Sequence, residues 1–297
     1  MPLDPEVVQF LESVKGAKPR SEMSIQETRQ AMLDARHLAL PPVPLAVAED
    51  REYGAVPVRV YQAEDITGLP TLVFAHGGRF ISGDLETHDS LCRQLAKRSL
   101  ARIVAVDYSR APEHRFPAAA EDVYSVVEAL YEESHCLAVG GDSAGGNLAM
   151  AASLIARDHG ETLISAAILI YPMLDALASL ESHKEFNEGF GPSSADMLRG
   201  WREYAPEIVD RKHPHLSPLW VEDLRGLPPV WILSAEYDTL RDEAEEFGRR
   251  LFFAGVSAEV VRAEGMIHGF LQHSAIINKA NLYLDQIAAA IRLHLFR

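Results

Sequence analysis

Residues 139–151, VGGDSAGGNLAMA, place a serine between two glycines. The stretch Gly141-Asp142-Ser143-Ala144-Gly145 fits the pattern Gly-x-Ser-x-Gly, which holds a serine on a tight turn from a strand into a helix. Small residues let such a turn close, and the helix N-terminus behind it contributes free N–H groups and a positive dipole. The pattern predicts that Ser143 is a nucleophile rather than an ordinary turn serine.

A serine hydroxyl is a weak nucleophile and needs a base. The chain order expected with this turn is serine, then Asp or Glu, then histidine. Asp238 in SAEYDTLRDEA and His268 in EGMIHGFLQ meet that order. We expect His268 to take the proton of Ser143 and deliver it to the leaving group, while Asp238 orients the imidazole. Asp242 is a rival acid, but we expect it to lie one turn inside a helix.

The five residues HGGRF, 76–80, directly follow the apolar run TLVFA. Attack on a carbonyl carbon places negative charge on its oxygen, and this charge needs preorganised donors. Glycine permits unusual backbone geometry and keeps side chains away from the carbonyl. We therefore predict an oxyanion hole made by the backbone N–H groups of Gly77, Gly78 and Ala144. We expect His76 to brace the loop by hydrogen bonding.

The sequence patterns around these motifs are typical of strands that alternate with helices. Short runs rich in Val, Ile and Leu, typical of strands covered on both faces, occur at 56–61, 71–76, 103–108, 137–142, 166–171, 230–235 and 258–263. Helical patterns lie between them at 88–100, 117–133, 144–160 and 240–255. The alternation predicts an α/β protein with a mostly parallel sheet. The candidate residues then follow the carboxyl ends of strands, where open α/β sheets place their sites.

Two segments break this alternation. Residues 1–50 contain two amphipathic patterns, about 4–16 and 24–39, and residues 175–225 are rich in proline with one helical part, SADMLRGWREYA. Compact α/β units use short loops, so an insertion this long indicates a cap; the alternative is decoration remote from the site. The predicted organisation is N-terminal cap helices at 1–50, a catalytic domain at 51–174 and 226–297, and a cap insertion at 175–225. We expect a final helix within 275–296 to pack on the sheet.

Composition excludes several classes of protein. The 297 residues carry a net charge of −15 with no visible stripe of Lys and Arg, so nucleic acid and anionic membranes are poor partners. The N-terminus lacks a signal-peptide pattern, and the longest nearly apolar run, 163–174, is too short to span a bilayer and contains a proline. These features predict a soluble cytoplasmic protein.

Neither a disulfide framework nor a metal site is expected. Cys92 and Cys136 stand 44 positions apart with no CxxC pattern, so free thiols are the default. His213 and His215, in HPH, have the types of metal ligands, but no cluster of carboxylates accompanies them. We expect loop histidines there and no metal.

The chain resembles the hormone-sensitive-lipase-like carboxylesterases (bacterial family IV) of the α/β-hydrolase superfamily. The motifs that carry the resemblance, from about residue 55 to the end, are HGGRF, DYSRAPEHRFPAAAED (107–122), GDSAGGNLA (141–149), YPMLD (171–175), AEYDTLRDE (235–243) and HGF (268–270). The resemblance implies an α/β-hydrolase fold, with an eight-stranded, mostly parallel sheet flanked by helices and a helical cap. It implies hydrolysis of short-acyl carboxylic esters, small-molecule substrates and no cofactor. Pairing through a C-terminal strand and helix, common in the family, is compatible with a homodimer.

The resemblance also implies the same roles for Ser143, Asp238 and His268, and the same oxyanion hole, but the chain departs from the family at two places. Arg79 stands where a third glycine is usual; it either points away and pairs with a carboxylate of the loop, or lines the substrate pocket and favours polar or anionic substituents. In DYSRAPEH an arginine has moved from position 109 to Arg110. We expect this segment to brace the oxyanion loop through Asp107, Glu113 and Asp122.

The sequence favours a serine carboxylesterase that works through an acyl-enzyme, and leaves its substrate open. An amidase, arylformamidase or lactonase would use the same machinery, because leaving-group preference lies in the cap and pocket walls. A non-catalytic receptor on this scaffold should lack a member of the triad, and a lipase for long chains should show an apolar lid. Candidate pocket residues are Arg79, Phe80, Asp142, Tyr171, Phe190, Trp201 and Leu216; those of the cap could instead form the core of the cap, as could Phe186.

Overall fold

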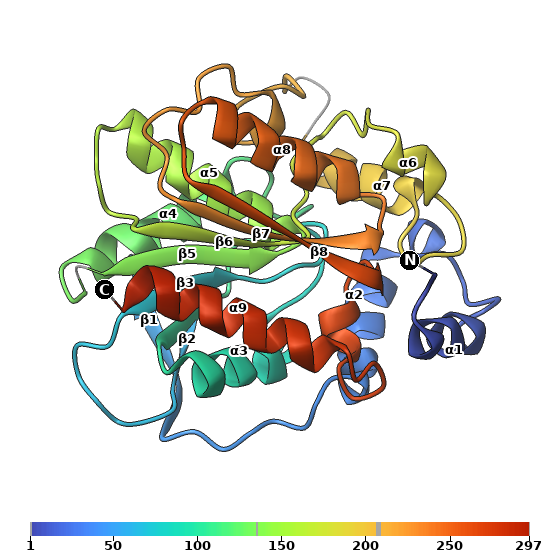
Figure 1. Ribbon diagram of the computed structural model, residues 1–297, viewed down its shortest axis with the longest axis horizontal. Coiled ribbons are helices and arrows are strands. Elements are labelled where there is room, and N and C mark those ends of the chain that lie inside the picture. Colours follow the sequence, from blue (N-terminus) through green and yellow to red (C-terminus); the bar gives the residue numbers. More distant parts are fainter. Residues whose placement is uncertain (1, 135, 206–208, 297) are drawn as a thin grey trace.

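A computed structural model describes residues 2–134, 136–205 and 209–296. Its centre is an eight-stranded sheet in the order β1-β2-β4-β3-β5-β6-β7-β8 (Figure 1). β2 pairs antiparallel with β1 and β4, and the other neighbours pair in parallel. The strands are β1 (Val47–Tyr53), β2 (Val56–Gln62), β3 (Thr71–Ala75), β4 (Arg102–Val106), β5 (Leu137–Asp142), β6 (Ala166–Ile170), β7 (Val230–Tyr237) and β8 (Ala258–Ile267). The predicted α/β class and mostly parallel sheet are confirmed.

Helices cover both faces of this sheet. One face packs on α4 (Ala118–Tyr131), α5 (Ala144–Asp158) and α8 (Arg241–Phe253), and the other on α3 (Leu85–Ser99) and α9 (Ala280–Leu295) (Figure 1). The central strands β3, β5 and β6 are buried along their whole length. This double burial explains why their sequences are continuous apolar runs.

The edge strand β1 was not predicted from its own residues. Its sequence, VAEDREY, has five exposed positions in the middle and lacks an apolar run. It pairs only with β2, across a turn at Gly54 and Ala55. Charged side chains are common on edge strands because they discourage pairing with another chain, so the hydrophobic signal is weak there.

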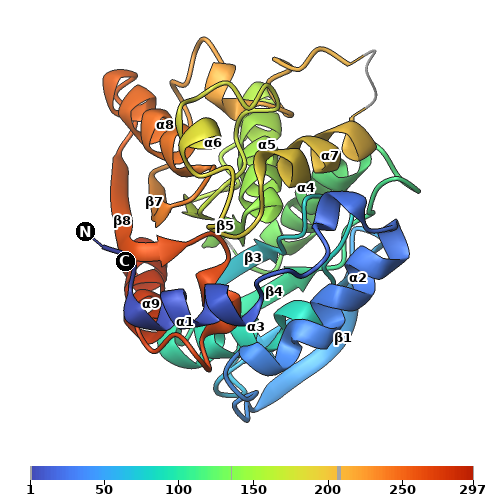
Figure 2. The same ribbon diagram turned by 90° about the vertical axis from the view of Figure 1, so that its right-hand side faces the viewer.

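A separate set of short helices lies where the parallel strands end. α1 (Pro5–Ser13), α2 (Ile25–Asp34), α6 (Ser182–Glu185) and α7 (Ser194–Tyr204) occupy the side toward which the strands point (Figures 1 and 2). Capping boxes fix the starts of α2 and α7, with Ser24 and Ser193 as the N-caps. The predicted helix at 24–39 is correct to Asp34 and then continues as a 3₁₀ turn, Ala35–Leu38. The four-residue α6 was not predicted.

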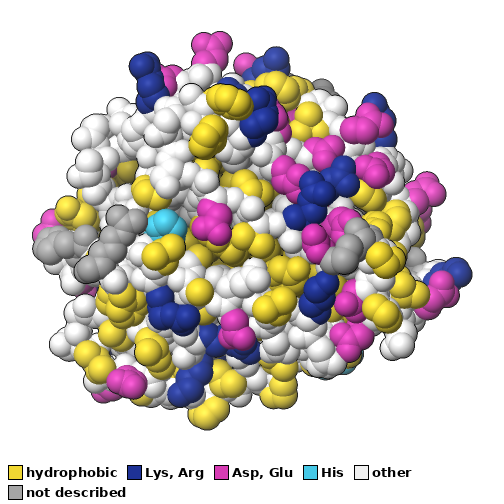
Figure 3. Space-filling view, in the orientation of Figure 1, with side chains coloured by type: hydrophobic (Ala, Val, Ile, Leu, Met, Phe, Trp, Pro, Cys, Tyr) yellow, Lys and Arg dark blue, Asp and Glu magenta, His cyan; other side chains and the backbone are white. Residues whose placement is uncertain are grey.

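The surface in Figure 3 has basic and acidic side chains interspersed. None of the helices within the described ranges is long and apolar enough to cross a membrane. Two surface hollows, of about 690 and 550 Å³, lie beside α8 and include Arg249 in their walls. Cys92 is buried and Cys136 half-buried, and both are free thiols.

A buried acid and a buried histidine join α6 to α8. His183 Nε2 lies 3.4 Å from Glu243 Oε1, and Glu243 Oε2 accepts the N–H of Leu174 at 2.7 Å. Burial raises the pKa of Glu243 to about 7. Burial opposes charge on His183 as well, but the neighbouring carboxyl raises the pKa of its imidazole above the ordinary value. The pair therefore retains a proton up to about neutral pH.

This pair predicts a fall in stability as pH rises toward 8. The folded-state pKa of Glu243, about 7, exceeds the unfolded value of about 4.3, so its stabilisation is complete below the unfolded pKa and is lost as pH rises through about 7. The raised pKa of His183 acts in the same direction. Melting temperatures at about pH 5 and pH 8 should differ less for Glu243→Gln than for the parent. The exposed Glu259→Gln should behave like the parent; equal pH dependence in all three proteins would contradict the prediction.

Candidate active site

Ser143 occupies the turn from β5 into α5. Its backbone is in the left-handed region, with φ of 56°, a strained geometry for a residue with a side chain. The turn is held on both sides: the N–H of Ser143 donates to Ile170 O at 2.8 Å, and its carbonyl accepts the N–H groups of Gly146 and Met173 at 3.0 and 3.1 Å. Backbone contacts with β6 and the segment after it thus fix the serine.

The two glycines of the Gly-x-Ser-x-Gly pattern are required by close packing on β3. A Cβ atom at Gly141 would stand 2.4 Å from Ala75 O, and one at Gly145 only 1.9 Å from the same oxygen. Both distances are far inside van der Waals contact. The end of β3 can therefore approach the turn only because both positions lack side chains.

The three predicted triad residues meet in space. His268 Nε2 lies 3.0 Å from Ser143 Oγ, and His268 Nδ1 lies 2.7 Å from Asp238 Oδ2. The other oxygen of Asp238 accepts the N–H of Leu240 at 2.9 Å. The three side chains follow β5, β7 and β8, so the topology of the sheet brings them together. The rival Asp242 lies in the first turn of α8, where it accepts the N–H of Ser182.

The hydrogen bonds of the loop after β3 show that one of the three predicted oxyanion donors, Gly77, is wrong. The N–H of Gly77 donates to Asp142 Oδ1 at 2.8 Å, so it is not available to a substrate. In the part of the chain that the structure describes, the N–H groups of Gly78 and Arg79 have no acceptor, nor does that of Ala144 at the start of α5. Gly78 has φ of 130°, and a Cβ atom there would stand 2.0 Å from Ser82 O. The N–H groups that remain free in this loop are therefore those of Gly78 and Arg79, where Gly77 and Gly78 had been predicted.

Asp142 joins the serine turn to this loop. Besides the N–H of Gly77, its carboxylate faces His88 Nε2 at 3.2 Å. Burial alone would raise the pKa of Asp142, but His88 and the N–H of Gly77 together hold it below its ordinary value. The predicted place of Asp142 in the substrate pocket is wrong, because both of its carboxylate oxygens are engaged, by the N–H of Gly77 and by His88.

His76 and Tyr108 support the same loop from behind. His76 Nδ1 lies 2.9 Å from Gly77 O, which agrees with the bracing predicted for this histidine. Its ring stacks on Tyr108 with 4.2 Å between centroids, and the Tyr108 hydroxyl donates to His76 O at 2.8 Å. Burial lowers the pKa of His76 to about 3, so the imidazole is neutral at neutral pH.

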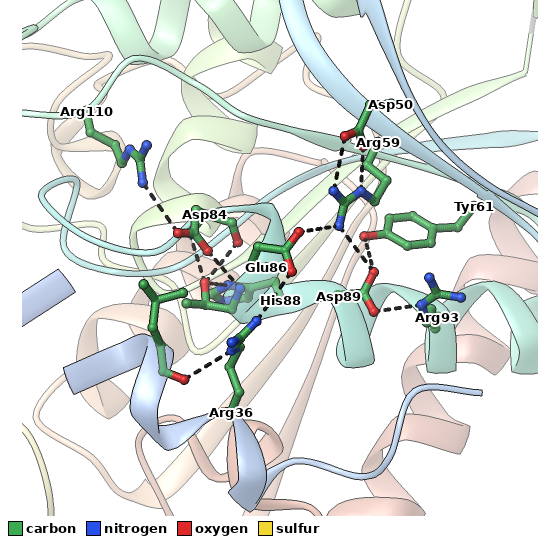
Figure 4. A network of polar contacts seen from close by, with 12 residues as sticks. Arg36, Asp50, Arg59, Tyr61, Asp84, Glu86, His88, Asp89, Arg93 and Arg110 are labelled. Atoms are coloured by element: carbon green, nitrogen blue, oxygen red, sulfur yellow. Dashed lines mark hydrogen bonds and ion pairs between the residues drawn. The ribbon is translucent and has the colours of Figure 1, made fainter. Parts of the chain in front are cut away.

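The 107–122 segment holds the far end of the loop with Arg110. Its Nη1 donates to Gly83 O at 2.6 Å and lies 3.9 Å from Asp84 Oδ2, which also caps α3 (Figure 4). Asp107 lies 3.9 Å from the same guanidinium. Figure 4 also shows Arg59 bonded to Asp50 and Glu86, which ties β1 and β2 to the start of α3.

Glu113 and Asp122 brace this region in different ways. Glu113 forms an ion pair with Arg29 of α2 at 2.6 Å, and Arg29 Nε donates to Ile81 O in the loop. Asp122 accepts the N–H of Ser109 at 2.7 Å. Arg29, like His88 and Tyr108, was missed by sequence reasoning, because none of the three belongs to a catalytic motif.

Three predicted pocket residues are core residues instead. Phe80 stacks on Tyr204 at 4.1 Å and lies 4.8 Å from Trp201. Phe80 and Leu216 have no exposed surface and Trp201 has 1%. These side chains attach α7 to the oxyanion loop and have no surface to offer a ligand.

Tyr171 belongs to the buried core beside the triad, and Phe190 packs against that core. The ring of Tyr171 lies 4.9 Å from that of His268 and is buried beside it. Phe190 is half-buried and stacks on Tyr237 at 5.4 Å, with Phe186 beside both rings. Far from the triad, His213 Nδ1 accepts the N–H of His215, as suits histidines of a loop.

The first of the two interpretations of Arg79 is wrong. The residue is 5% exposed, has φ of 55°, and makes no ion pair with any residue in the described ranges. It does not pair with a carboxylate of its own loop. It lies instead against α7, where a Cβ atom at Gly200 would stand 2.6 Å from Arg79 Cβ.

Comparison with known proteins finds relatives over most of the chain. Residues 72–272 match a family described by its alpha/beta hydrolase fold. The carboxylic ester hydrolase LipN of Mycobacterium tuberculosis is 35% identical over 257 residues, which are 82% of this chain and 68% of that protein. An arylesterase of Saccharolobus solfataricus is 32% identical over 285 residues, covering 91% and 93%. An ethyl acetate hydrolase of Pseudomonas putida is 31% identical over 256 residues, covering 82% and 80%.

Solved structures of esterases superpose over nearly the whole chain. A hyperthermophilic esterase from the archaeon Pyrobaculum calidifontis has a TM-score of 0.93 at 36% identity, covering 99% of both chains. A thermostable esterase from Pseudomonas putida has a TM-score of 0.92 at 30% identity, covering 99% of this chain and 98% of that one.

The hydrogen bond from the Tyr108 hydroxyl to His76 O predicts that removal of this hydroxyl lowers the stability of the protein. Tyr108→Phe should lower the free energy of unfolding by about 1–3 kcal/mol, because it leaves the buried carbonyl of His76 without its donor. Tyr53→Phe is the matched control, since its hydroxyl bonds Glu133 at the surface; it should change stability by less than about 0.5 kcal/mol. Urea unfolding measures both. Equal effects would mean that the Tyr108 hydrogen bond does not support the loop.

Proposed function

This chain belongs to the hormone-sensitive-lipase-like carboxylic ester hydrolases of the α/β-hydrolase family, and we propose that it cleaves short-acyl esters through an acyl-enzyme on Ser143. The observation that carries the proposal is the line Asp238–His268–Ser143, with heavy-atom distances of 2.7 and 3.0 Å, on a strained turn. Such a line is the arrangement of a nucleophile, its base and an orienting acid. The names of the arylesterase and the ethyl acetate hydrolase support small esters as substrates.

In the first step Ser143 Oγ attacks the carbonyl carbon of the ester. His268 Nε2, 3.0 Å away, accepts the hydroxyl proton as the new C–O bond forms. Asp238, which is 1% exposed, accepts the hydrogen bond from Nδ1–H and stabilises the imidazolium. The result is a tetrahedral intermediate with a negative oxygen.

The backbone N–H groups of Gly78, Arg79 and Ala144 bind that oxygen. They are free of other acceptors among the described residues, while Gly77 serves only to fix the loop through Asp142. Because Asp142 belongs to the serine turn, the donors and the nucleophile are fixed relative to each other. Preorganised donors stabilise developing charge without reorganisation at the moment of reaction.

The intermediate collapses when the bond to the leaving alcohol breaks. His268 returns its proton to the alkoxide oxygen, and the alcohol departs. Water then attacks the acyl carbon while His268 takes its proton; the second intermediate releases the carboxylic acid, and Ser143 recovers its hydrogen. Helices α1, α2, α6 and α7 form the cap in this proposal, and shape the entry of the substrate.

Hydrolysis of p-nitrophenyl esters from acetate to dodecanoate tests the proposal. The parent should prefer short chains, and Ser143→Ala should lower kcat/KM by at least about 1,000-fold, because the nucleophile is lost. Ser257→Ala, at an exposed position, should keep the parent rate. Turnover that persists in Ser143→Ala would show that another group is the nucleophile, and no turnover by the folded parent would contradict an esterase.

A further inference from the structure

Arg79 is a buried cation without an acceptor. Only 5% of the surface of this residue is exposed to solvent. A guanidinium carries five N–H donors, and the nitrogens of Arg79 are not among the fully buried side-chain atoms that lack a partner. None of the described residues accepts a hydrogen bond from it or forms an ion pair with it. A buried cation in this state is suited to an anion that comes from outside the chain.

The surroundings of Arg79 add positive charge. Arg20, in the 3₁₀ turn Arg20–Glu22 below α7, and Arg199 on α7 both act on Arg79 electrostatically and oppose its charge. Burial, Arg20 and Arg199 lower the pKa of Arg79 to about 9, which still leaves it a cation at neutral pH. Arg199 Nη1 donates to the carbonyl of Arg20 at 2.6 Å, which fixes the two segments together.

Among the described residues, the carboxylate whose charge acts on both arginines is Asp196. It raises the pKa of both Arg79 and Arg20 through its charge, yet makes no ion pair with either. One of its oxygens accepts the N–H of Ser193 at 2.9 Å at the start of α7, and the other has no partner. Arg20 is half-buried, and its side chain has no acceptor within the described ranges. An uncompensated pair of guanidinium groups therefore remains.

The backbone of Arg79 belongs to the loop of the proposed oxyanion donors. Arg79 directly follows Gly78 in the oxyanion loop, and its side chain starts against Gly200 of α7. Asp196 lies one turn toward the start of α7, which Figure 2 shows above the ends of the central strands. Burial, together with the charges of Arg20 and His268, lowers the pKa of His273 to about 4. Arg20 is therefore within electrostatic range of a neighbour of the triad.

We propose that Arg79 and Arg20 form an anion subsite, and that the preferred substrates are esters bearing a free carboxylate, such as half-esters of dicarboxylic acids. A guanidinium binds a carboxylate through two parallel hydrogen bonds, and burial strengthens them. The inference rests on the ester hydrolysis proposed above, because the carboxylate is placed by the same loop that binds the oxyanion. It explains why an arginine occupies a position of positive φ next to Gly78.

Matched pairs of esters test the subsite on either side of the scissile bond. For the acyl side, 4-nitrophenyl hydrogen glutarate is compared with 4-nitrophenyl pentanoate; for the alcohol side, 4-acetoxybenzoate with 4-acetoxybenzamide. The parent should favour the carboxylate in at least one pair. Arg79→Gln and Arg20→Gln should each lower that kcat/KM ratio by about 10- to 100-fold, and Arg79→Lys should lower it less. Arg225→Gln, which removes an exposed arginine paired with Asp223, should leave the ratio unchanged.

The ratio of charged to neutral ester separates the two proposals. If the parent cleaves neutral esters but shows no preference for a carboxylate, or a preference that both glutamine variants retain, the subsite is wrong and the esterase stands. If the parent cleaves none of these esters, glutarate binding to Ser143→Ala decides the matter by calorimetry. Binding that Arg20→Gln or Arg79→Gln abolishes supports the subsite without turnover, and absence of binding overturns it.

Discussion

The carboxylate of Asp142 accepts the N–H of Gly77 at 2.8 Å, and this one hydrogen bond joins the two loops on which the site depends. Asp142 ends β5 and precedes the nucleophile, while Gly77 follows β3, the neighbouring strand. The bond occupies the N–H of Gly77, and the next two N–H groups have no acceptor among the described residues. His88 supports the carboxylate from α3, so the position of the donors relative to Ser143 depends on the packing of helix, turn and loop together.

The close approach of β3 and the serine turn makes that bond geometrically attainable. Gly141 and Gly145 allow the carbonyl of Ala75 to lie against the turn, since a methyl group at either position would collide with it. The glycines of the Gly-x-Ser-x-Gly pattern thus act on the neighbouring strand as well as on the turn. Tyr108, Arg110 and Arg29 then fix the rest of the loop through its carbonyl oxygens.

In the loop after β3, the backbone and the side chain of Arg79 have different surroundings. Its backbone N–H has no acceptor among the described residues, and its Cβ atom lies against Gly200 of α7. Phe80 packs against the same helix, in the aromatic cluster with Trp201 and Tyr204. Two neighbouring residues of the loop therefore contact α7.

The sequence by itself determined the features that depend on local order along the chain. Buried parallel strands have apolar runs as sequences, and the Gly-x-Ser-x-Gly turn is defined by five consecutive residues. Asp238 could be chosen over Asp242 because Asp238 directly follows a strand. Only the tertiary structure decided which groups are already engaged. It assigned the N–H of Gly77 to Asp142, 65 positions away, buried Phe80 and Leu216, and left the side chain of Arg79 without a hydrogen-bond partner among the described residues. These outcomes arise from contacts between distant segments, and local periodicity carries no information about such contacts.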